Sequence, residues 1–401
     1  MRWPFWALLR WVNSGKPDWW IAFGAVAGIG LLNKWTFGLF GAALVVALAL
    51  TPHRRVFRES RFLLAGALAI ALVLPHVLWQ AHHEWPMAEF SRNARAYKMA
   101  GFSPLEFLTS QILIMGPVTL PLWLAGLAYL LASKAMERYR FLAYLFLALL
   151  AAHLLSGGKS YYLAPAYTVL FAAGAILIER TPRTAPWKII LRTAAPVVVM
   201  AGGLIVAPIA FPVLSPEGYA RYAAAIGIEP PRDEKQELGT LPQIFADRFG
   251  WENQVAAVAR VFRGLPPEEQ MQAVIFTRNY GEAGAIDFWG PRYGLPRAIS
   301  THNSYWLWGP RGATGETVIV LGATRDKLEG LFASVVEGAR HIAVRDAGGN
   351  RSSRLRLPRI ENCRGRILGG EQALHLSSKL PAEFFSSAPP TGRDGKGPCD
   401  S

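Results

Sequence analysis

The sequence predicts an α-helical polytopic membrane protein that carries a C-terminal extracytoplasmic α/β domain. Three observations lead to this fold class. Hydrophobic residues make up 52% of the 401 residues, and charged residues make up only 17%. The apolar residues are concentrated in long runs before residue 214, and short basic loops separate these runs. From residue 215 onward, charged and polar residues become as frequent as in ordinary globular domains.

The apolar runs predict a membrane domain over residues 1–214. A run of about 18 or more apolar residues can cross a bilayer core roughly 30 Å thick, and in lipid such runs are expected to be helices. Several runs reach or approach this length, so we expect about seven membrane-crossing helices. Their approximate bounds are Trp19–Leu32, Thr36–Leu50, Phe62–Trp79, Leu105–Ala132, Phe141–Leu155, Tyr161–Ile178 and Thr193–Leu214.

Basic loops predict the orientation of these helices, because lysine and arginine in short loops mark the cytoplasmic face. Four basic stretches alternate with the other loops and can all lie in the cytoplasm at once. They are the N-terminal Arg2, Arg10 and Lys16, the loop His53–Arg61, the loop Lys134–Arg140 and the stretch Arg180–Arg192. This arrangement places Lys34, the loop Ala81–Pro104, the turn Ser156–Ser160 and the C-terminal part outside the cytoplasm. The outer loop Ala81–Pro104 carries Arg92, Arg95 and Lys98, although the charge bias favours basic residues on the cytoplasmic side.

Residues 215–345 are expected to form the soluble α/β domain. The stretch Asn253–Arg263 has helical spacing and is followed by Gly264. The β-branched runs Ala273–Phe276 and Thr317–Leu321 suit buried strands, and each precedes a plausible helix. Residues 346–401 are rich in Gly, Ser, Arg and Pro, so we expect a largely disordered tail.

The formal net charge of +14 does not indicate nucleic-acid binding, because the basic residues are spread over membrane loops and no nucleic-acid motif accompanies them. The two cysteines, Cys363 and Cys399, form neither a disulfide framework nor a metal-ligand pattern.

Lys34 is the first candidate functional residue, since it follows Leu32-Asn33 at the predicted outer end of a helical hairpin. An ammonium group there is a suitable point charge for a phosphate. The alternative is a lysine that only extends its charge to the interface at a helix end.

The loop His82–Asn93 is the second candidate. Arg92 offers a guanidinium fork for a phosphate, and aromatic residues of this loop suit the membrane interface. Adjacent His82 and His83 with Glu84 could hold a divalent metal, although so close a spacing is weak support for a metal site. The alternative is an interfacial amphipathic segment.

The turn Gly157–Pro165 is the third candidate, because Lys159 adds another outward cation and tyrosines follow it. It lacks the glycine spacing of a nucleotide phosphate loop. The alternative is a tight turn with an aromatic belt. All three candidates fall on one side of the membrane, and outward cations at membrane level suit a lipid-linked phosphate.

These motifs together resemble a known family. Leu-x-Lys after a Gly-rich run, the outer His/Trp/Glu/Phe/Arg loop and Lys-x-x-Tyr-Leu-x-Pro look like dolichyl-phosphate-mannose–protein mannosyltransferase and aminoarabinose transferase-like GT-C glycosyltransferases (bacterial glycosyltransferase family 39 type). The likeness covers about Trp19 to Arg180. The stretches Asn279–Asp287 and His302–Trp306 look like the soluble domain of one bacterial subgroup.

The resemblance implies a partial GT-C-like fold in a bacterial inner (cell) membrane. It implies an enzyme that transfers a sugar from a polyprenyl-phosphate donor to an extracytoplasmic lipid, glycan or protein. Lys34 and Arg92 would bind the donor phosphate, and Glu89, Lys159 and Tyr162 would line the same cavity. The aminoarabinose transferases have a histidine after the acidic residue of this loop. Phe90 stands there in this chain, so a metal has little support.

The family's catalytic aspartate has no counterpart in this sequence. The first acid is Asp18, on the predicted cytoplasmic side, and the acids of the outward loops are Glu84, Glu89 and Glu106. The catalytic residue is therefore unassigned. We expect a chain that lacks the family's N-terminal helices and that does not catalyse transfer alone.

The predicted soluble domain offers a set of aromatic, amide and carboxylate side chains that suit either a sugar or a packed core. They are Asn279, Tyr280, Glu282, Asp287, His302, Asn303, Tyr305, Trp306 and Trp308. Two other functions stay open: a transporter or flippase of a lipid-linked substrate, and a non-catalytic membrane-anchored glycan-binding protein.

Overall fold

The structure is a computed structural model that describes residues 2–94, 96, 101–180, 186–211, 213–227, 247–313, 315–321, 328, 336–341 and 355–359. Contacts divide the chain into two compact units. The first comprises residues 1–95 and 100–211, and the second comprises 96–99 and 212–401. The boundary predicted from the sequence, after residue 214, lies close to this division. Arg95, Lys98, Arg183, both cysteines and most of the predicted tail lie outside the described residues.

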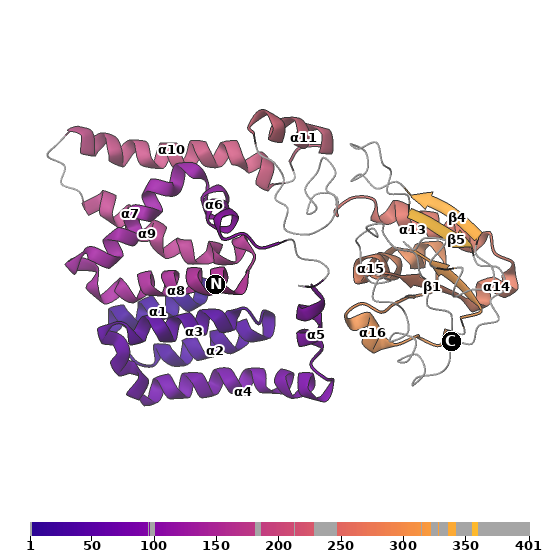
Figure 1. Cartoon of the computed structure of the whole chain (residues 1–401), viewed down its shortest axis with the longest axis horizontal. Coiled ribbons are helices and arrows are strands. Elements are labelled where there is room, and N and C mark those ends of the chain that lie inside the picture. Colours follow the sequence, from indigo (N-terminus) through magenta and orange to yellow (C-terminus); the bar gives the residue numbers. More distant parts are fainter. Residues whose placement is uncertain are drawn as a thin grey trace, which may run out of the picture. The chain divides into compact units, whose positions relative to one another are not determined.

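The first unit is helical throughout its described part (Figure 1). The α-helices are α1 (Arg2–Ser14), α2 (Trp19–Asn33), α3 (Phe37–Ala49), α4 (Ser60–His82), α5 (Pro86–Asn93), α6 (Pro104–Met115), α7 (Leu120–Ala132), α8 (Arg140–Ser156), α9 (Tyr167–Arg180) and α10 (Pro186–Ala210). Short 3₁₀ helices connect them, namely η1 (Pro52–Arg58), η3 (Pro117–Thr119), η4 (Lys134–Tyr139) and η5 (Ser160–Ala166).

Several of these helices are long and apolar enough to cross a membrane, so the chain is a multi-pass membrane protein. Four helical stretches in the described part meet both conditions: Ser60–His82, Lys134–Ser156, Ser160–Arg180 and Ile189–Ala210. Counting each of two bent helix pairs as one span raises the number to six, and Trp19–Asn33 is a shorter apolar helix. The fold class predicted from the sequence is confirmed.

The apolar run Leu105–Ala132 is not one continuous helix, and that part of the sequence prediction is wrong. The run is broken at Gly116, which has φ +83°, and Pro117 follows it. A residue with a side chain rarely adopts this φ, and the proline removes a backbone donor from the next turn. The two halves therefore meet at an angle of 88°. Hydropathy measures only apolar content and does not detect such a break.

The N-terminal stretch forms helix α1, which lies outside the predicted apolar runs. Phe5, Leu8 and Trp11 are buried, and they recur at the spacing of one helix face. The exposed Arg10 lies over the rings of Trp6 and Trp19, at 5.7 and 5.1 Å from their centroids. Helix α1 is therefore part of the packed unit.

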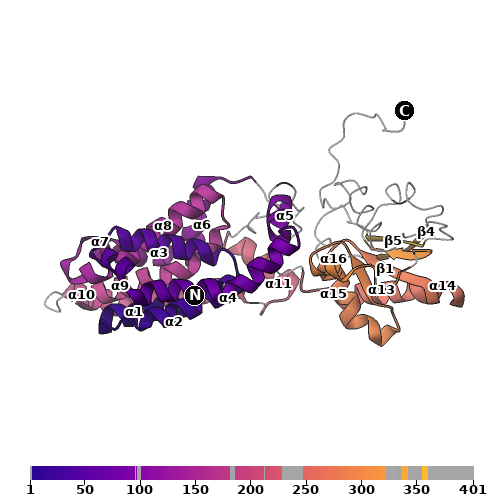
Figure 2. The same ribbon diagram turned by 90° about the horizontal axis from the view of Figure 1, so that it is seen from below.

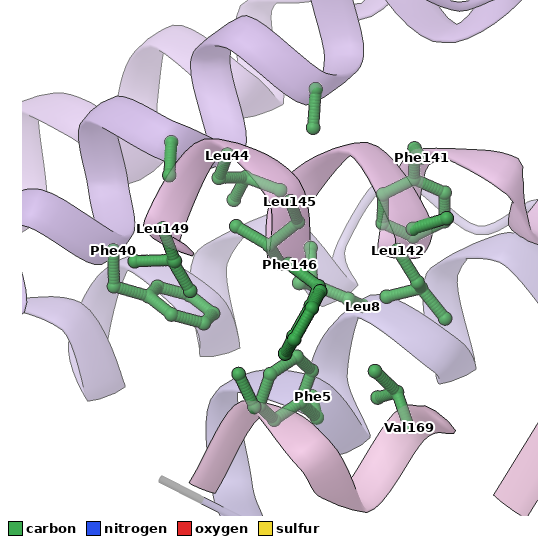
Figure 3. Close-up of a cluster of buried hydrophobic side chains, with 14 of the residues drawn as sticks. Phe5, Leu8, Phe40, Leu44, Phe141, Leu142, Leu145, Phe146, Leu149 and Val169 are labelled. Atoms are coloured by element: carbon green, nitrogen blue, oxygen red, sulfur yellow. The ribbon is translucent and has the colours of Figure 1, made fainter. Parts of the chain in front are cut away.

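The core of the first unit lies between α1, α3, α8 and α9. Figure 3 shows Phe5 and Leu8 of α1 beside Phe40 of α3 and the row of apolar side chains along α8. The Phe5 and Phe40 rings meet edge to face with centroids 5.3 Å apart. Because lipid is as apolar as these side chains, tight van der Waals packing is what stabilises such contacts within a bilayer.

Helices α7 and α9 approach each other closely at two glycines. A Cβ on Gly126 would lie 2.0 Å from the Leu170 carbonyl oxygen, and a Cβ on Gly174 would lie 2.3 Å from the Leu122 carbonyl oxygen. Real Cβ atoms do not come this near to backbone oxygen. Small residues are therefore required here, as at many helix contacts in membranes.

Three of the four predicted cytoplasmic stretches meet at one end of the unit, which we term the basic end. Asp18, before α2, pairs with Arg61 in the first turn of α4 at 3.2 Å. A ring nitrogen (Nε2) of His53 lies 2.8 Å from the Arg138 carbonyl oxygen. The Tyr139 hydroxyl donates a hydrogen bond to Asn13. Stretches that lie on the same face of a membrane are expected to meet in this way.

The second unit contains a parallel three-stranded sheet in the order β2-β1-β3. Its elements are α11 (Pro216–Ala225), α13 (Trp251–Arg263), α14 (Pro267–Gln272), β1 (Ala273–Thr277), α15 (Tyr280–Trp289), η6 (Gly290–Tyr293), β2 (Ala298–Ser300), α16 (Ser304–Trp308), β3 (Thr317–Val320), β4 (Val336–His341) and β5 (Leu355–Arg359). Ile275 pairs with Ala298 on one side and with Ile319 on the other. Figure 2 shows α13 and α15 beside β1.

The core of the second unit is formed by β1, β3, α13 and α15. Ile275, Ile286 and Val258 are essentially inaccessible to solvent. The predicted strands and the predicted helix Asn253–Arg263 are all present, with bounds that differ by one or two residues. Of the tail predicted to be largely disordered, the described part holds strand β5, which pairs antiparallel with β4 and was not predicted.

Candidate functional site

Lys34 lies immediately after α2, at the end of that helix opposite to the basic end. Its backbone N–H closes the helix on the Gly30 carbonyl at 2.9 Å, and its side chain is exposed. The ammonium nitrogen lies 3.9 Å from the ring centroid of Tyr162 and 5.8 Å from that of Tyr161. A cation at this distance over a ring face is attracted to the electrons of the ring. We refer to Lys34, Lys159, Tyr161 and Tyr162 as the Lys34 site.

The turn between α8 and α9 places the tyrosines of the Lys34 site. Helix α8 ends at Gly157 with φ +63°. A Cβ on the next residue, Gly158, would lie 2.5 Å from the His153 Nδ1 atom. Lys159 directly precedes η5, and the Tyr162 N–H donates to the Lys159 carbonyl at 3.0 Å. Lys159 and Tyr162 are therefore held within one turn of each other.

Two buried polar side chains support this turn, and the sequence analysis did not single out either of them. The Gln111 amide of α6 donates to the Ser160 carbonyl at 3.1 Å, which ties α6 to η5. His153 of α8 is 4% exposed, and its ring centroid lies 6.0 Å from that of Tyr162. A lone polar residue inside an apolar run is costly in a membrane and is often functional. This signal could have identified both residues.

Helix α4 contacts the Lys34 end of α2 as well. The Trp35 indole N–H donates to a ring nitrogen (Nε2) of His76 at 3.4 Å. The side-chain oxygen of Gln80, one turn further along α4, accepts a hydrogen bond from the Met87 N–H at 3.1 Å. Gln80 is itself buried. These bonds connect α2 to α4, and α4 to the first turn of α5.

Helix α5 carries Glu89 and Arg92, and it runs across the end of α4 (Figure 1). The connection to α4 passes through Glu84 and Trp85, both at φ 60°, and this left-handed pair turns the chain sharply. Glu89 and Arg92 are exposed, and within the described residues neither forms an ion pair. The structure thus brings Lys34, Lys159 and Tyr162 together, while Glu89 and Arg92 lie on a neighbouring helix at the same end.

His82, His83 and Glu84, the residues considered for a divalent metal, lie at the C-terminal end of α4 and just after it. The His83 ring uses Nδ1 in a 2.8 Å contact with the Trp79 carbonyl oxygen, and it is stacked on the Trp79 ring. No group of three or more His, Cys, Asp or Glu side chains suited to a metal occurs among the residues that the structure describes.

Two sets can be distinguished among the candidate residues of the second unit. Asn279 caps α15 by accepting from the Glu282 N–H at 2.9 Å, and the Glu282 carboxylate accepts from the Arg278 N–H at 3.1 Å. Burial raises the pKa of Glu282, and its ion pair and hydrogen bonds oppose this shift. These residues hold the helix start and have a structural role.

The second set comprises Asp287, Tyr305 and Trp308. With Arg297 and Arg311, they line a cavity of about 530 Å³. His302, after β2, instead makes an edge-to-face ring contact with Tyr280 at 5.1 Å.

Comparison with known proteins gives one family match. Residues 1–79 match the family model described as dolichyl-phosphate-mannose-protein mannosyltransferase. This segment contains α1 to α3, most of α4 and Lys34, and it ends before Glu89, Arg92, Lys159 and Tyr162. Over residues 1–79 this match supports the family resemblance predicted from the motifs, and the rest of the predicted likeness, up to Arg180, lies outside it. No curated protein and no solved structure matches the chain.

Proposed function

We propose that this membrane protein, whose residues 1–79 match the dolichyl-phosphate-mannose-protein mannosyltransferase family, is a GT-C glycosyltransferase or part of one that uses a polyprenyl-phosphate-linked sugar. The phosphate of the donor binds at the Lys34 site. The acceptor is an extracytoplasmic lipid, glycan or protein, and the protein resides in a bacterial inner membrane with the second unit outside. The observation that carries this proposal is the position of Lys34 over Tyr162, at the helix ends opposite to the basic end.

The electrostatics of the Lys34 site suit an anionic lipid head. Among the described residues Lys34 forms no ion pair, so no carboxylate neutralises its charge. An ammonium and a phosphate about 4 Å apart attract each other by about 4 kcal/mol at the effective dielectric near a protein surface. Lys159 adds a second cation within one turn of Tyr162. The Lys34 ammonium lies over the rings of Tyr162 and Tyr161.

Arg92 is the proposed second phosphate ligand, and Glu89 is a proposed lining residue of the same cavity. Both lie on α5, whose first turn is tied to α4 by Gln80. A guanidinium group binds phosphate through two parallel N–H donors, which Lys34 cannot do. Arg92 has its guanidinium exposed in the last turn of α5 and is available for this role.

The chemical step requires a base. The acceptor oxygen attacks the anomeric carbon of the sugar, the bond from that carbon to the phosphate oxygen breaks, and the polyprenyl phosphate leaves. The proton of the acceptor hydroxyl passes to a general base, which is an aspartate in the family that the motifs resemble. No residue of this chain corresponds to that aspartate. We therefore expect the chain alone to bind the donor without turning it over.

Binding and turnover are tested separately with the purified full chain in lipid nanodiscs. We expect a polyprenyl monophosphate to bind, and Lys34→Gln to weaken binding by about tenfold, because one ion pair with phosphate is lost. Arg54→Gln, an exposed charge at the basic end, is the matched control and should bind as the parent does. Absence of binding by the parent chain, or equal weakening by both variants, would overturn the donor site. Sugar transfer to added membrane acceptors by the chain alone would overturn the expected inactivity.

A transporter or flippase is the competing function. Transporters place charged residues near the middle of the membrane and use internal repeats. In this structure, by contrast, Lys34, Lys159 and Arg92 lie at or beyond the ends of helices. Reconstitution into liposomes with a labelled polyprenyl-phosphate sugar would reveal transbilayer movement, which the proposed function does not predict.

A further inference from the structure

The second unit contains a cavity that neither the family match nor the donor site accounts for. Asp287 of α15, Arg297 before β2, Tyr305 and Trp308 of α16, and Arg311 after α16 line a volume of about 530 Å³. Pockets that hold small molecules typically measure about 300 to 1,000 Å³. The five side chains come from separate segments that meet beside the edge strand β2.

The Asp287 carboxylate forms hydrogen bonds to its neighbours in the cavity, so it is not free. Its Oδ1 atom accepts from the Ala298 N–H at 2.9 Å, and its Oδ2 atom accepts from the Tyr305 hydroxyl at 3.1 Å and from Arg311 at 3.0 Å. Burial and the Asp287 carboxylate raise the pKa of Tyr305 to about 12, so the hydroxyl remains a donor at neutral pH. Asp287 therefore fixes the positions of Tyr305 and Arg311.

The cavity carries excess positive charge. Arg311 uses one nitrogen on Asp287 and is 19% exposed, so further N–H donors remain for a ligand. Arg297 is exposed, and among the described residues it forms no ion pair. Two guanidinium groups thus face one carboxylate. Guanidinium groups bind carboxylate and phosphate groups through paired hydrogen bonds.

An aromatic wall lies beside these charges. Trp308 is 54% exposed, and its ring meets the Tyr305 ring edge to face with centroids 4.7 Å apart. The Arg311 guanidinium lies over both rings, 5.4 Å from the Tyr305 centroid and 5.1 Å from the Trp308 centroid. An indole that is about half exposed is a suitable surface for the apolar face of a sugar ring.

The backbone around α16 is strained on both sides of this wall. Asn303, before α16, has φ 55° and ψ −135°, and Arg311, after it, has φ 52°. Each such conformation costs about 1–3 kcal/mol and persists mainly where the surrounding structure requires it. The Arg311 side chain contacts Asp287 and lies over the two rings.

We infer that this cavity binds an anionic sugar, with a pyranose ring stacked on Trp308 and a carboxylate or phosphate held by Arg297 and Arg311. The excess of one positive charge favours an acidic ligand over a neutral one, and the open indole favours a ring over an inorganic ion. The inference does not depend on the donor site of the first unit, because the two sites share no residue.

The test is a titration of the purified full chain with four probes: glucuronic acid, glucose 6-phosphate, glucose and inorganic phosphate. Binding is followed by intrinsic tryptophan fluorescence and by calorimetry. We expect one or both acidic sugars to bind with a Kd of about 1 mM or tighter. Comparison of the Kd of glucuronic acid with the Kd of glucose 6-phosphate shows whether the site prefers a carboxylate or a phosphate. Glucose and inorganic phosphate should each bind at least about tenfold more weakly.

Substitutions of residues that line the cavity test whether the ligand binds there. Arg297→Gln should weaken binding of the acidic sugar by about tenfold, and Trp308→Leu by a similar factor. The matched controls are Arg292→Gln and Phe288→Ala, exposed residues of the same unit that do not line the cavity, and they should bind as the parent does. Arg297 is exposed, so its substitution tests the site even if Trp308→Leu fails to fold. The inference is overturned if no acidic sugar binds at about 10 mM. Glucose or inorganic phosphate binding as tightly as the acidic sugars would also overturn it, as would an unchanged affinity in Arg297→Gln.

Discussion

The ammonium nitrogen of Lys34 lies 3.9 Å from the ring centroid of Tyr162, so the end of α2 and the turn before α9 form one site. These residues are far apart in the sequence, and the helices between them bring them together. Lys34 would otherwise be one of many lysines that follow a membrane helix. Its contact with Tyr162, with Lys159 nearby in the same turn, supports a phosphate-binding role more strongly than the charge of Lys34 alone does.

The contact between Lys34 and Tyr162 predicts a graded response to substitution. Tyr162→Phe keeps the ring face and should retain most of the affinity for a polyprenyl monophosphate. Tyr162→Leu removes the ring and should weaken binding by about threefold to tenfold, because a cation–π contact is worth about 0.5–1 kcal/mol at exposed sites and more when desolvated. Titration of both variants in nanodiscs measures the difference. Equal affinities of the Phe and Leu variants would show that the ring does not position Lys34.

The close approach of α7 and α9 predicts a large loss of stability for a substitution that adds a single methyl group between them. Gly126→Ala should lower the unfolding temperature in detergent, since the new Cβ would lie 2.0 Å from backbone oxygen and the helices would have to separate. We expect a cost of about 1–3 kcal/mol, which is typical of overpacking. Thermal unfolding followed by circular dichroism provides the measurement.

Gly41→Ala is the matched control, since nothing lies within 4 Å of a Cβ at that position in α3. It should be neutral or slightly stabilising, because alanine favours a helix by about 1 kcal/mol over glycine. A loss of stability as large in Gly41→Ala as in Gly126→Ala would contradict the packing described for α7 and α9.

Burial of Glu282 predicts a pH-dependent stability of the second unit. Burial raises the pKa of this carboxyl in the folded state above its ordinary value of 4.5. The folded state therefore holds the proton more tightly than the unfolded state. This contribution to stability is fully present below about pH 4.5 and is lost as the pH rises through the folded pKa.

Glu282→Gln removes this titration and keeps an oxygen that can accept from Arg278. The unfolding free energy of the parent chain minus that of the variant should be larger near pH 4 than near pH 7. Thermal unfolding of both proteins, followed at the transition of the second unit, gives the comparison. If the parent gained stability relative to the variant as the pH rose, the direction of the pKa shift would be wrong.

The sequence predicted β1, β3 and α13 of the second unit, because local patterns determine them. The β-branched run that begins at Ala273 and the amphipathic helix that ends at Arg263 are short-range signals. It did not predict the break at Gly116, since hydropathy does not report a left-handed backbone. It did not predict α1 either, because Arg10 and the many tryptophans conceal a helix face that only packing reveals.

The candidate site was predictable in part for similar reasons. Lys34, Lys159 and Tyr162 were expected on one side of the membrane from the alternation of basic loops, and the structure adds the contact between Lys34 and Tyr162. Gln111 and His153 were missed although each is a polar residue in a long apolar run, because the sequence does not show that both lie beside Ser160 and Tyr162. The cavity around Asp287 was not predictable as a unit, since its five residues come from segments that converge only in the folded domain.

The central claim is that Lys34 faces the side of the membrane opposite to Arg54. Cys363→Ser and Cys399→Ser first remove the native thiols, and Lys34→Cys and Arg54→Cys are then introduced separately. Intact cells are treated with a membrane-impermeant maleimide before and after permeabilisation. Position 34 should be labelled in intact cells, and position 54 only after permeabilisation. Labelling of position 54 but not of position 34 in intact cells would contradict this claim.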